Sequence, residues 1–159
     1  RNKNPILMKI ALHFFGKKPS IHQSQILENY LKRIPKSYAL NVILHNKLAH
    51  KDTATQLAKE LTFLTMQTQS GGTHILLDEG GQTLSSREFE NFIQKKLQSG
   101  ILHFYVGGAN GFHHEVDKLN LLKISISSFT LPHEIARLIL VEQIYRAYTL
   151  SVGHPYHNE

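Results

Sequence analysis

The sequence has no cysteine and no apolar run long enough to cross a membrane. The missing cysteine excludes disulfides, zinc–thiolate sites and cysteine nucleophiles together, and it suits a reducing compartment. A membrane-spanning helix needs about 20 apolar residues in a row. A signal peptide needs an apolar core, which the opening segment Arg1–Leu7 lacks. We therefore expect a cytoplasmic protein that has no membrane partner.

Composition is that of one folded domain. The 159 residues are 41% hydrophobic and 19% charged, which is ordinary for a globular protein and gives no sign of disorder. A chain of this length can bury a substantial core. We expect a single domain over residues 8–159, with Met8 as a natural start. We interpret residues 1–7 as an N-terminal extension or an expression remnant.

Positive charge is concentrated in the first part of the chain. Residues 1–60 contain eleven Lys and Arg against three acids, a net charge of +8, whereas residues 61–159 contain seven against nine, a net of −2. A basic half beside a nearly neutral half is typical of a surface that faces a polyanion, and nucleic acid is the commonest such partner. A solvated lysine-rich face is the alternative.

Short apolar segments alternate with amphipathic ones along the whole chain. This alternation, with strands that are apolar without interruption, predicts an α/β fold with a mostly parallel sheet and helices on both faces. The expected strands are residues 9–15, 38–45, 74–77, 101–106 and 122–127, and the expected helices are residues 20–34, 53–67, 85–97 and 132–151, with a short helical piece at 114–119.

Three of the expected strands run into irregular loops that contain Gly or Ser, at residues 77–81, 106–111 and 126–132. In an open α/β sheet the ligand crevice lies outside the carboxyl ends of the strands, so these loops should converge there. Gly107–Gly111 is either a backbone cradle for a ligand or a tight turn. It matches neither the dinucleotide fingerprint nor the P-loop.

The polar C-terminal tail is the other candidate for chemistry. Pro155 prevents helix formation, so His154, Tyr156 and His157 should be presented by a constrained segment, where they can act as a base, hydrogen-bond donors or stacking platforms. Although the chain has eleven histidines, none of them forms an H-E-x-x-H motif, and we expect no metal. The preceding helix is apolar on nearly all sides, which favours either a second subunit or plain burial.

Four segments of the last third of the chain carry a resemblance to a known family. They are Gly107-Gly108-Ala109-Asn110-Gly111, Phe129-Thr130-Leu131-Pro132-His133, Arg137–Ala147 and His154-Pro155-Tyr156-His157. Together they resemble the RlmH family, SPOUT-class methyltransferases that methylate N3 of a pseudouridine in 23S ribosomal RNA. The resemblance runs from about Met8 to Glu159 and is specific in the last third of the chain.

The resemblance implies an enzyme that uses S-adenosylmethionine, works as a homodimer, has a deep C-terminal trefoil knot, and acts on the large ribosomal subunit or the assembled ribosome. By motif position, the implied cofactor contacts are Leu77, Gly108, Ser127, Ser128, Phe129, Thr130, Leu131 and Pro132. The residues implied to orient the base or take up its proton are His154, Tyr156 and His157, with Arg146 holding the substrate or stabilising negative charge. The candidates for phosphate contact are Lys17, Lys18, Lys32 and Arg33.

The chain departs from the family pattern in two places. The loop after Leu77-Asp78 commonly carries a basic residue in the family, whereas this chain has Glu79-Gly80-Gly81-Gln82. Asn158 stands where a basic residue usually precedes the final Glu. A non-catalytic module that binds RNA or the ribosome is therefore the alternative function. A nucleotide-binding domain that acts on small molecules is a third, which the absence of phosphate motifs disfavours.

Overall fold

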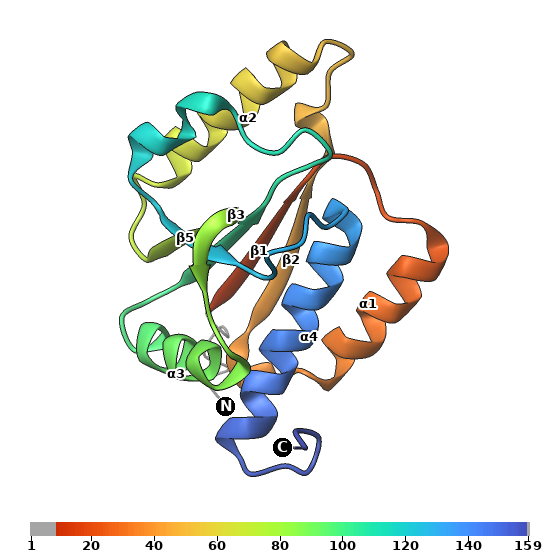
Figure 1. Cartoon of the computed structure of the whole chain (residues 1–159), viewed down its shortest axis with the longest axis vertical. Helices are drawn as coiled ribbons and strands as arrows, with labels where there is room; N and C mark the ends of the chain where they lie inside the picture. Colours follow the sequence, from red (N-terminus) through yellow and green to blue (C-terminus); the bar gives the residue numbers. More distant parts are fainter. Residues whose placement is uncertain (1–8, 159) are drawn as a thin grey trace, which may run out of the picture.

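The fold, taken from a computed structural model that describes residues 9–158, is built on one parallel sheet of five strands in the order β2-β1-β4-β3-β5 (Figure 1). The expected extension at residues 1–7 lies outside the described part of the chain. The strands are β1 (Ile10–Phe15), β2 (Leu40–His45), β3 (Thr73–Thr83), β4 (Leu102–Val106) and β5 (Leu122–Ser125).

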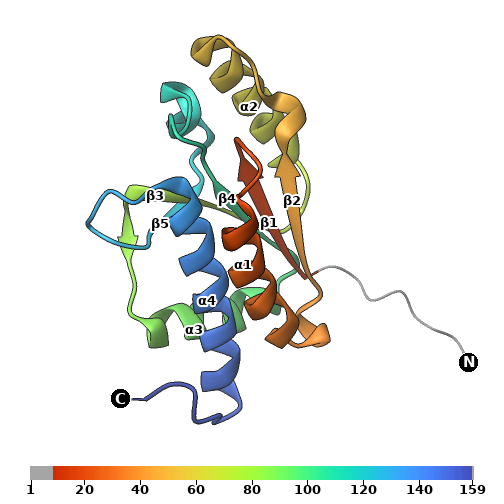
Figure 2. The same ribbon diagram turned by 90° about the vertical axis from the view of Figure 1, so that its right-hand side faces the viewer.

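Helices cover both faces of this sheet, which confirms the α/β fold expected from the sequence (Figures 1 and 2). On one face lie α1 (Ile21–Arg33), α3 (Ser86–Leu97) and α4 (His133–Ser151), and on the other α2 (Thr53–Gln67) and the 3₁₀ helix η3 (His114–Leu119). Two 3₁₀ turns, η1 (Lys36–Tyr38) and η2 (Asn46–Leu48), flank β2.

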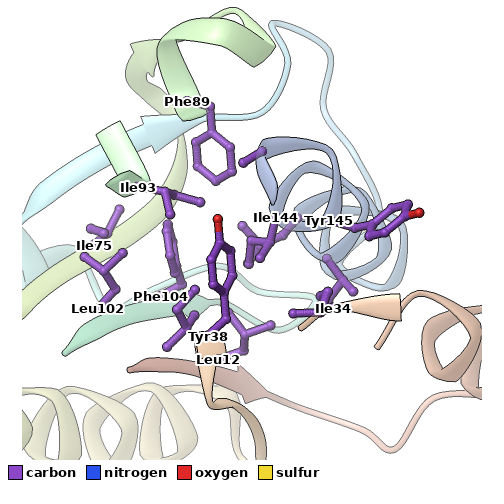
Figure 3. Packing of buried hydrophobic residues seen from close by; sticks show 14 of the residues in the cluster. Leu12, Ile34, Tyr38, Ile75, Phe89, Ile93, Leu102, Phe104, Ile144 and Tyr145 are labelled. Carbon is purple, nitrogen blue, oxygen red and sulfur yellow. The ribbon is translucent and has the colours of Figure 1, made fainter. Parts of the chain in front are cut away.

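The hydrophobic core lies in two layers because successive strand residues point to opposite faces. On the first face Leu12, Phe104 and Ile75 pack beneath α3 and α4, where they meet Ile93 and Ile144 (Figure 3). All five side chains are fully buried. Burying each such side chain contributes about 1.5–3 kcal/mol, so this layer is the main source of stability for the sheet.

Side-chain caps fix the starts of three helices. Ser20 and Ser85 each accept a hydrogen bond from the third backbone N–H of the following helix. The side chain of that third residue accepts a bond from the backbone N–H of the serine, which completes a capping box. Asp52 caps α2 through the backbone N–H of Thr55. The expected starts of these helices are therefore confirmed, because capping residues are readable from sequence.

The loop expected after Leu77 is instead a wide bulge within β3. Leu77 and Gln82 both register with Ile124 of β5, so the residues between them are left out of the ladder. A side chain on Gly81 would place its Cβ 2.7 Å from backbone atoms of Ile124. Gly81 is thus required for the approach of two strands, whereas the loop was expected to bend around a ligand.

The long apolar helix α4 is largely accounted for by burial against the sheet, α1 and α3. Two large apolar side chains remain exposed: Ile135 in α4, at 39% of its surface, and Val152 at the C-terminal end of the helix, at 55%. Within residues 9–158 no helix is long and apolar enough to span a bilayer. The trefoil knot implied by the resemblance is compatible with this arrangement and stays a prediction.

Candidate active site

A cavity of about 380 Å³ opens at the carboxyl ends of β3, β4 and β5. This is where ligands bind in open parallel sheets, and the volume is within the usual range for small-molecule sites. The two expected loops at residues 106–111 and 126–132 both line it, and the third wall is the start of the β3 bulge, Leu77–Glu79. The lining combines Leu77, Asp78, Glu79, Val106, Gly107, Gly108, Ala109, Gly111, Phe112, Ser125, Ile126, Ser127, Phe129, Thr130, Leu131, His133 and Ala136.

The glycine segment after β4 is a tight turn as well as a wall of the cavity. Gly108 and Gly111 form an isolated bridge, and Gly111 has a positive φ of 66°. A Cβ on Gly108 would lie 3.3 Å from the carbonyl oxygen of Phe15. Glycine at position 108 therefore makes room for the end of β1, and the two interpretations of this segment hold together.

The turn after β5 is held by its own serines. Ser125 Oγ donates to the carbonyl of Ser127 at 2.9 Å, and the backbone N–H of Phe129 donates to Ser127 Oγ at 2.9 Å. Phe129 is left 78% exposed beside the cavity. Of the eight expected cofactor contacts, six line the cavity: Leu77, Gly108, Ser127, Phe129, Thr130 and Leu131. Ser128 and Pro132 belong to the same turn but not to the lining, and Pro132 instead precedes α4 as its N-cap.

A guanidinium at the start of α4 ties the cavity to β1. Arg137 is 2% exposed and donates to the carbonyls of Phe15 and Lys17, at 2.6 and 3.0 Å. Its guanidinium also lies over the ring of Phe14. Burial lowers the pKa of Arg137, with Glu134 acting in the opposite direction. These two bonds fix the backbone that follows β1, directly beside Gly108.

The tail forms a second cluster at the other end of α4. Glu142 Oε1 accepts hydrogen bonds from Tyr156 Oη at 3.0 Å and from two nitrogens of Arg146. Arg146 Nη1 also lies 3.1 Å from His157 Nδ1, and its guanidinium stacks over the Tyr156 ring. Arginine can only donate, so His157 Nδ1 accepts. His154 is exposed, and its Nδ1 accepts from the backbone N–H of Tyr156.

Electrostatics fix the protonation states of Tyr156 and Arg146 near neutral pH. Burial and hydrogen bonds to Tyr30 and Glu142 raise the pKa of Tyr156 well above that of a free phenol. The carboxylate of Glu142 raises the pKa of Arg146. Tyr156 is therefore a neutral donor and Arg146 a permanent cation, which disfavours Tyr156 as a base that takes up a proton.

The cavity and the tail cluster are far apart within one chain. The cavity touches His133 in the first turn of α4, and Arg146 follows 13 residues later, which corresponds to about 20 Å along a helix. Figures 1 and 2 show the C-terminal segment beyond the opposite end of α4. Arg146, Tyr156 and His157 are thus brought together, with His154 exposed next to them in the chain, but none of the four is brought to the cavity of its own chain.

The expected phosphate contacts are also divided between the two ends. Lys17 and Lys18 are exposed in the segment after β1, beside the cavity. Lys32 and Arg33 lie in the last turn of α1, where the Arg33 guanidinium is 6.0 Å from the ring centroid of Tyr145. The Tyr145 ring in turn contacts Tyr156 of the tail. This second pair belongs to the tail end of the molecule.

Comparison with known proteins decides the family. The family model described as "Predicted SPOUT methyltransferase" matches residues 8–157. Proteins named ribosomal RNA large subunit methyltransferase H are 35% identical in Flavobacterium psychrophilum and 37% identical in Porphyromonas gingivalis. Both matches cover 96% of this chain and 100% of the relative. The chain belongs to the RlmH family of SPOUT methyltransferases.

Solved structures agree with this family at the level of the fold. A methyltransferase from Legionella pneumophila, solved with bound S-adenosylmethionine, superposes with a TM-score of 0.51. The match covers 88% of this chain and 66% of that one, at 14% identity. At this identity the likeness establishes the shared fold.

The sequence did not indicate a site role for two residues that the structure places at or next to the cavity, His133 and Arg137. His133 lines the cavity, its Nε2 is buried without a hydrogen-bond partner in the described chain, and burial lowers its pKa. Arg137 does not line the cavity, but it binds the carbonyls of Phe15 and Lys17 next to it. Both fall within the quoted family motifs. Their roles depend on which side of α4 faces the loops of the cavity. The sequence does not show this, because an irregular turn precedes that helix.

Proposed function

We propose that this chain transfers a methyl group from S-adenosylmethionine to N3 of a pseudouridine in 23S ribosomal RNA. The observation that carries the proposal is the cavity. Three segments distant in sequence (the end of β3, the glycine turn after β4 and the serine turn after β5) meet there. Two of these segments contain the motifs that resemble the RlmH family. We expect the enzyme to act in the cytoplasm, where this RNA is found.

The residues present fit the cofactor. Adenine and the methionine chain are held by backbone hydrogen bonds and apolar walls, and Leu77, Phe129 and Leu131 supply such walls. The buried, unpartnered Nε2 of His133 is left for a polar group of a ligand. When bound, the cofactor would supply an electrophilic methyl group on a sulfonium. The protein's task is then to position the acceptor nitrogen in line with it.

The tail would handle the acceptor base. N3 must lose its proton before it can attack, so negative charge develops on the base, and the Arg146 cation can stabilise that charge. Glu142 holds Arg146 and Tyr156 in fixed orientations. His154 and His157 remain the candidates for taking up the proton, each at the Nδ1 that accepts a hydrogen bond here, because the raised pKa of Tyr156 keeps it a donor.

A homodimer reconciles these roles with the separation of about 20 Å along α4. A second copy packed about a two-fold axis against the outer side of α1 and α4, with its α4 antiparallel to the first, would bring each tail to the cavity of the other protomer. Exposed apolar groups lie at the cavity end of this surface: Ile21 is 70% exposed, Phe129 78% and Ile135 39%. Such a cluster favours burial against a partner.

Transfer of a labelled methyl group tests this function. Purified protein is incubated with methyl-labelled S-adenosylmethionine and either whole 70S ribosomes or free 50S subunits, and the modified nucleoside is then mapped. The expected result is label at N3 of one pseudouridine of 23S RNA. Ribosome binding without any transfer would instead support the non-catalytic module. Transfer to small molecules alone would contradict both.

A further inference from the structure

Four exposed lysines follow the two strands at one side of the sheet. Lys17 and Lys18 come directly after β1, and Lys47 and Lys51 come in the segment after β2. Because β1 and β2 are parallel neighbours and Phe15 registers with His45, both segments leave the sheet at the same edge. Figure 1 shows this common exit. We call these four residues the lysine rim.

One half of the rim borders the cavity. A Cβ on Gly16 would lie 3.3 Å from the Cα of Gly108, which is a lining residue. Arg137 holds the carbonyl of Lys17, so the backbone from which the first two lysines project is fixed. Lys47 and Lys51 follow β2, on the far side of β1 from the cavity, so the rim leads from the edge strand toward the cavity.

Charge is divided across the cavity. On its β3 side the lining includes Asp78 and Glu79. Within residues 9–158 none of the four rim lysines forms an ion pair, in contrast to Lys123, whose ammonium is paired with Asp117. The acid nearest to the rim in sequence is Asp52, whose carboxylate caps α2 through Thr55. A polyanion is thus attracted to one side of the cavity and repelled from the other.

We propose that the lysine rim binds the backbone phosphates of the RNA strand that leads to the target base. The RNA then enters over the ends of β1 and β2 and avoids the acidic β3 side. This proposal rests on the proposed function, and it adds Lys47 and Lys51 to the contacts expected from the sequence.

Phosphate contacts have a measurable signature. Each one releases counterions, so binding weakens with salt, with a slope of about 0.7 in log–log form per contact on a single strand. Losing two rim lysines should reduce that slope by about 1.4 and weaken binding equally for all sequences. A lysine that contacts solvent alone changes neither quantity.

The test uses the full-length protein with two double variants, Lys47→Ala/Lys51→Ala and Lys17→Ala/Lys18→Ala. The control is Lys95→Ala/Lys96→Ala, which removes the same charge from the last turn of α3, at the opposite edge of the sheet. KM for ribosomes and filter binding to ribosomal RNA are measured between 50 and 200 mM KCl. Affinity for S-adenosylmethionine is measured by calorimetry.

Each rim variant should raise KM about tenfold at 50 mM KCl and much less at 200 mM, which corresponds to a salt slope reduced by about 1.4, with kcat and cofactor affinity unchanged. Rim variants that match the control in KM and slope would overturn the proposal. If the wild type transfers no methyl group, the proposed function fails. In that case filter binding still decides on the rim, because it does not depend on transfer.

Discussion

At the scale of single residues, one carboxylate organises the tail. Glu142 Oε1 accepts from both Arg146 and Tyr156, and the side chain of Glu142 is only 16% exposed. Where solvent exposure is this low, each hydrogen bond to a charged group contributes about 1.5–3 kcal/mol to stability. The sequence shows that Glu142 and Arg146 are four residues apart, a spacing that places their side chains next to each other on a helix. The structure shows that Tyr156 also binds Glu142, which gives Glu142 the role of positioning both side chains.

Replacing this carboxylate tests that role. Glu142→Gln should lower kcat for methyl transfer about tenfold and leave cofactor affinity unchanged, because the neutral amide holds Arg146 and Tyr156 more weakly. Tyr156→Phe should lower kcat less. The double variant should be no slower than Glu142→Gln alone, since both changes break the same contact. Fully additive losses in the measured kcat would mean that the two residues act independently.

Gly108 gives a second prediction at this scale. Its added Cβ would press on the Phe15 carbonyl at 3.3 Å, so Gly108→Ala should cost about 1 kcal/mol of unfolding free energy and weaken S-adenosylmethionine binding about tenfold. Gly71→Ala is the control, because a Cβ there meets nothing within 4 Å. Calorimetry and urea denaturation measure the two effects. Equal cofactor affinity in both variants would contradict the account.

At the scale of elements, the second face of the sheet carries a buried histidine network. His13 of β1 hydrogen-bonds His45 of β2 at 2.9 Å and His103 of β4 at 3.1 Å. His74 of β3 accepts from the Tyr105 hydroxyl and donates to the Ser70 carbonyl. These rings replace aliphatic packing beneath α2. Among residues 9–158 no group of three His, Cys, Asp or Glu is arranged to hold a metal.

This network should make stability depend on pH. Burial and the neighbouring rings lower the pKa of His13 to about 3, and burial and His74 lower the pKa of His103 to about 4. In the unfolded chain both pKa values are about 6.5, so the unfolded state binds protons first as the pH falls. Stability should be constant above pH 6.5 and fall by about 2–3 kcal/mol per pH unit between pH 6 and 4.

Urea denaturation at several pH values measures this slope. The window between pH 6.5 and 5 reports mainly on histidines, because Asp52 and Glu88 have lowered pKa values and titrate below it. Burial raises the pKa of Glu60, so the same series is measured on Glu60→Gln to separate its contribution. His13→Gln should roughly halve the slope, whatever it does to absolute stability. His22→Gln, at an exposed position of α1, should leave the slope unchanged. A wild-type slope of zero in this window would contradict the network's role.

The elements themselves were largely predictable from sequence, for identifiable reasons. Ser20, Asp52 and Ser85 are capping residues, and their bonds are local. The bulge of β3 was not predictable, because Gly80 and Gly81 read as a loop and only the partner strand β5 shows that Gln82 rejoins the ladder. The histidine network was missed for the same reason: its members come from four strands and meet only through the sheet.

The site was predictable in its parts and not in its arrangement. Loop chemistry indicated the cavity, and the family resemblance indicated the turn Ser127–Pro132 and the tail. The helix expected at residues 132–151 already separates these two regions along the chain, but the sequence does not show which side of that helix faces the cavity. The same holds for Arg137, whose partners Phe15 and Lys17 lie more than a hundred residues away.

At the scale of the whole molecule, function requires two copies if the tail acts on the base beside the cofactor. A cavity at one end of α4 and a tail at the other cannot meet within one chain, because the helix between them is rigid and packed on the sheet. In the proposed dimer, each site combines the cavity of one protomer with the tail of its partner. The lysine rim and the tail-end cations Lys32 and Arg33 then face one RNA.

Complementation between two inactive variants tests this directly. Leu131→Arg places a large charged group in the cavity, and Tyr156→Ala/His157→Ala disables the tail. Each variant alone should transfer no methyl group to ribosomes. A heterodimer isolated through two different affinity tags contains one intact cavity opposite one intact tail, so it should recover about half the wild-type rate. A heterodimer as inactive as its parents would show that cavity and tail work within one chain, and would contradict the account.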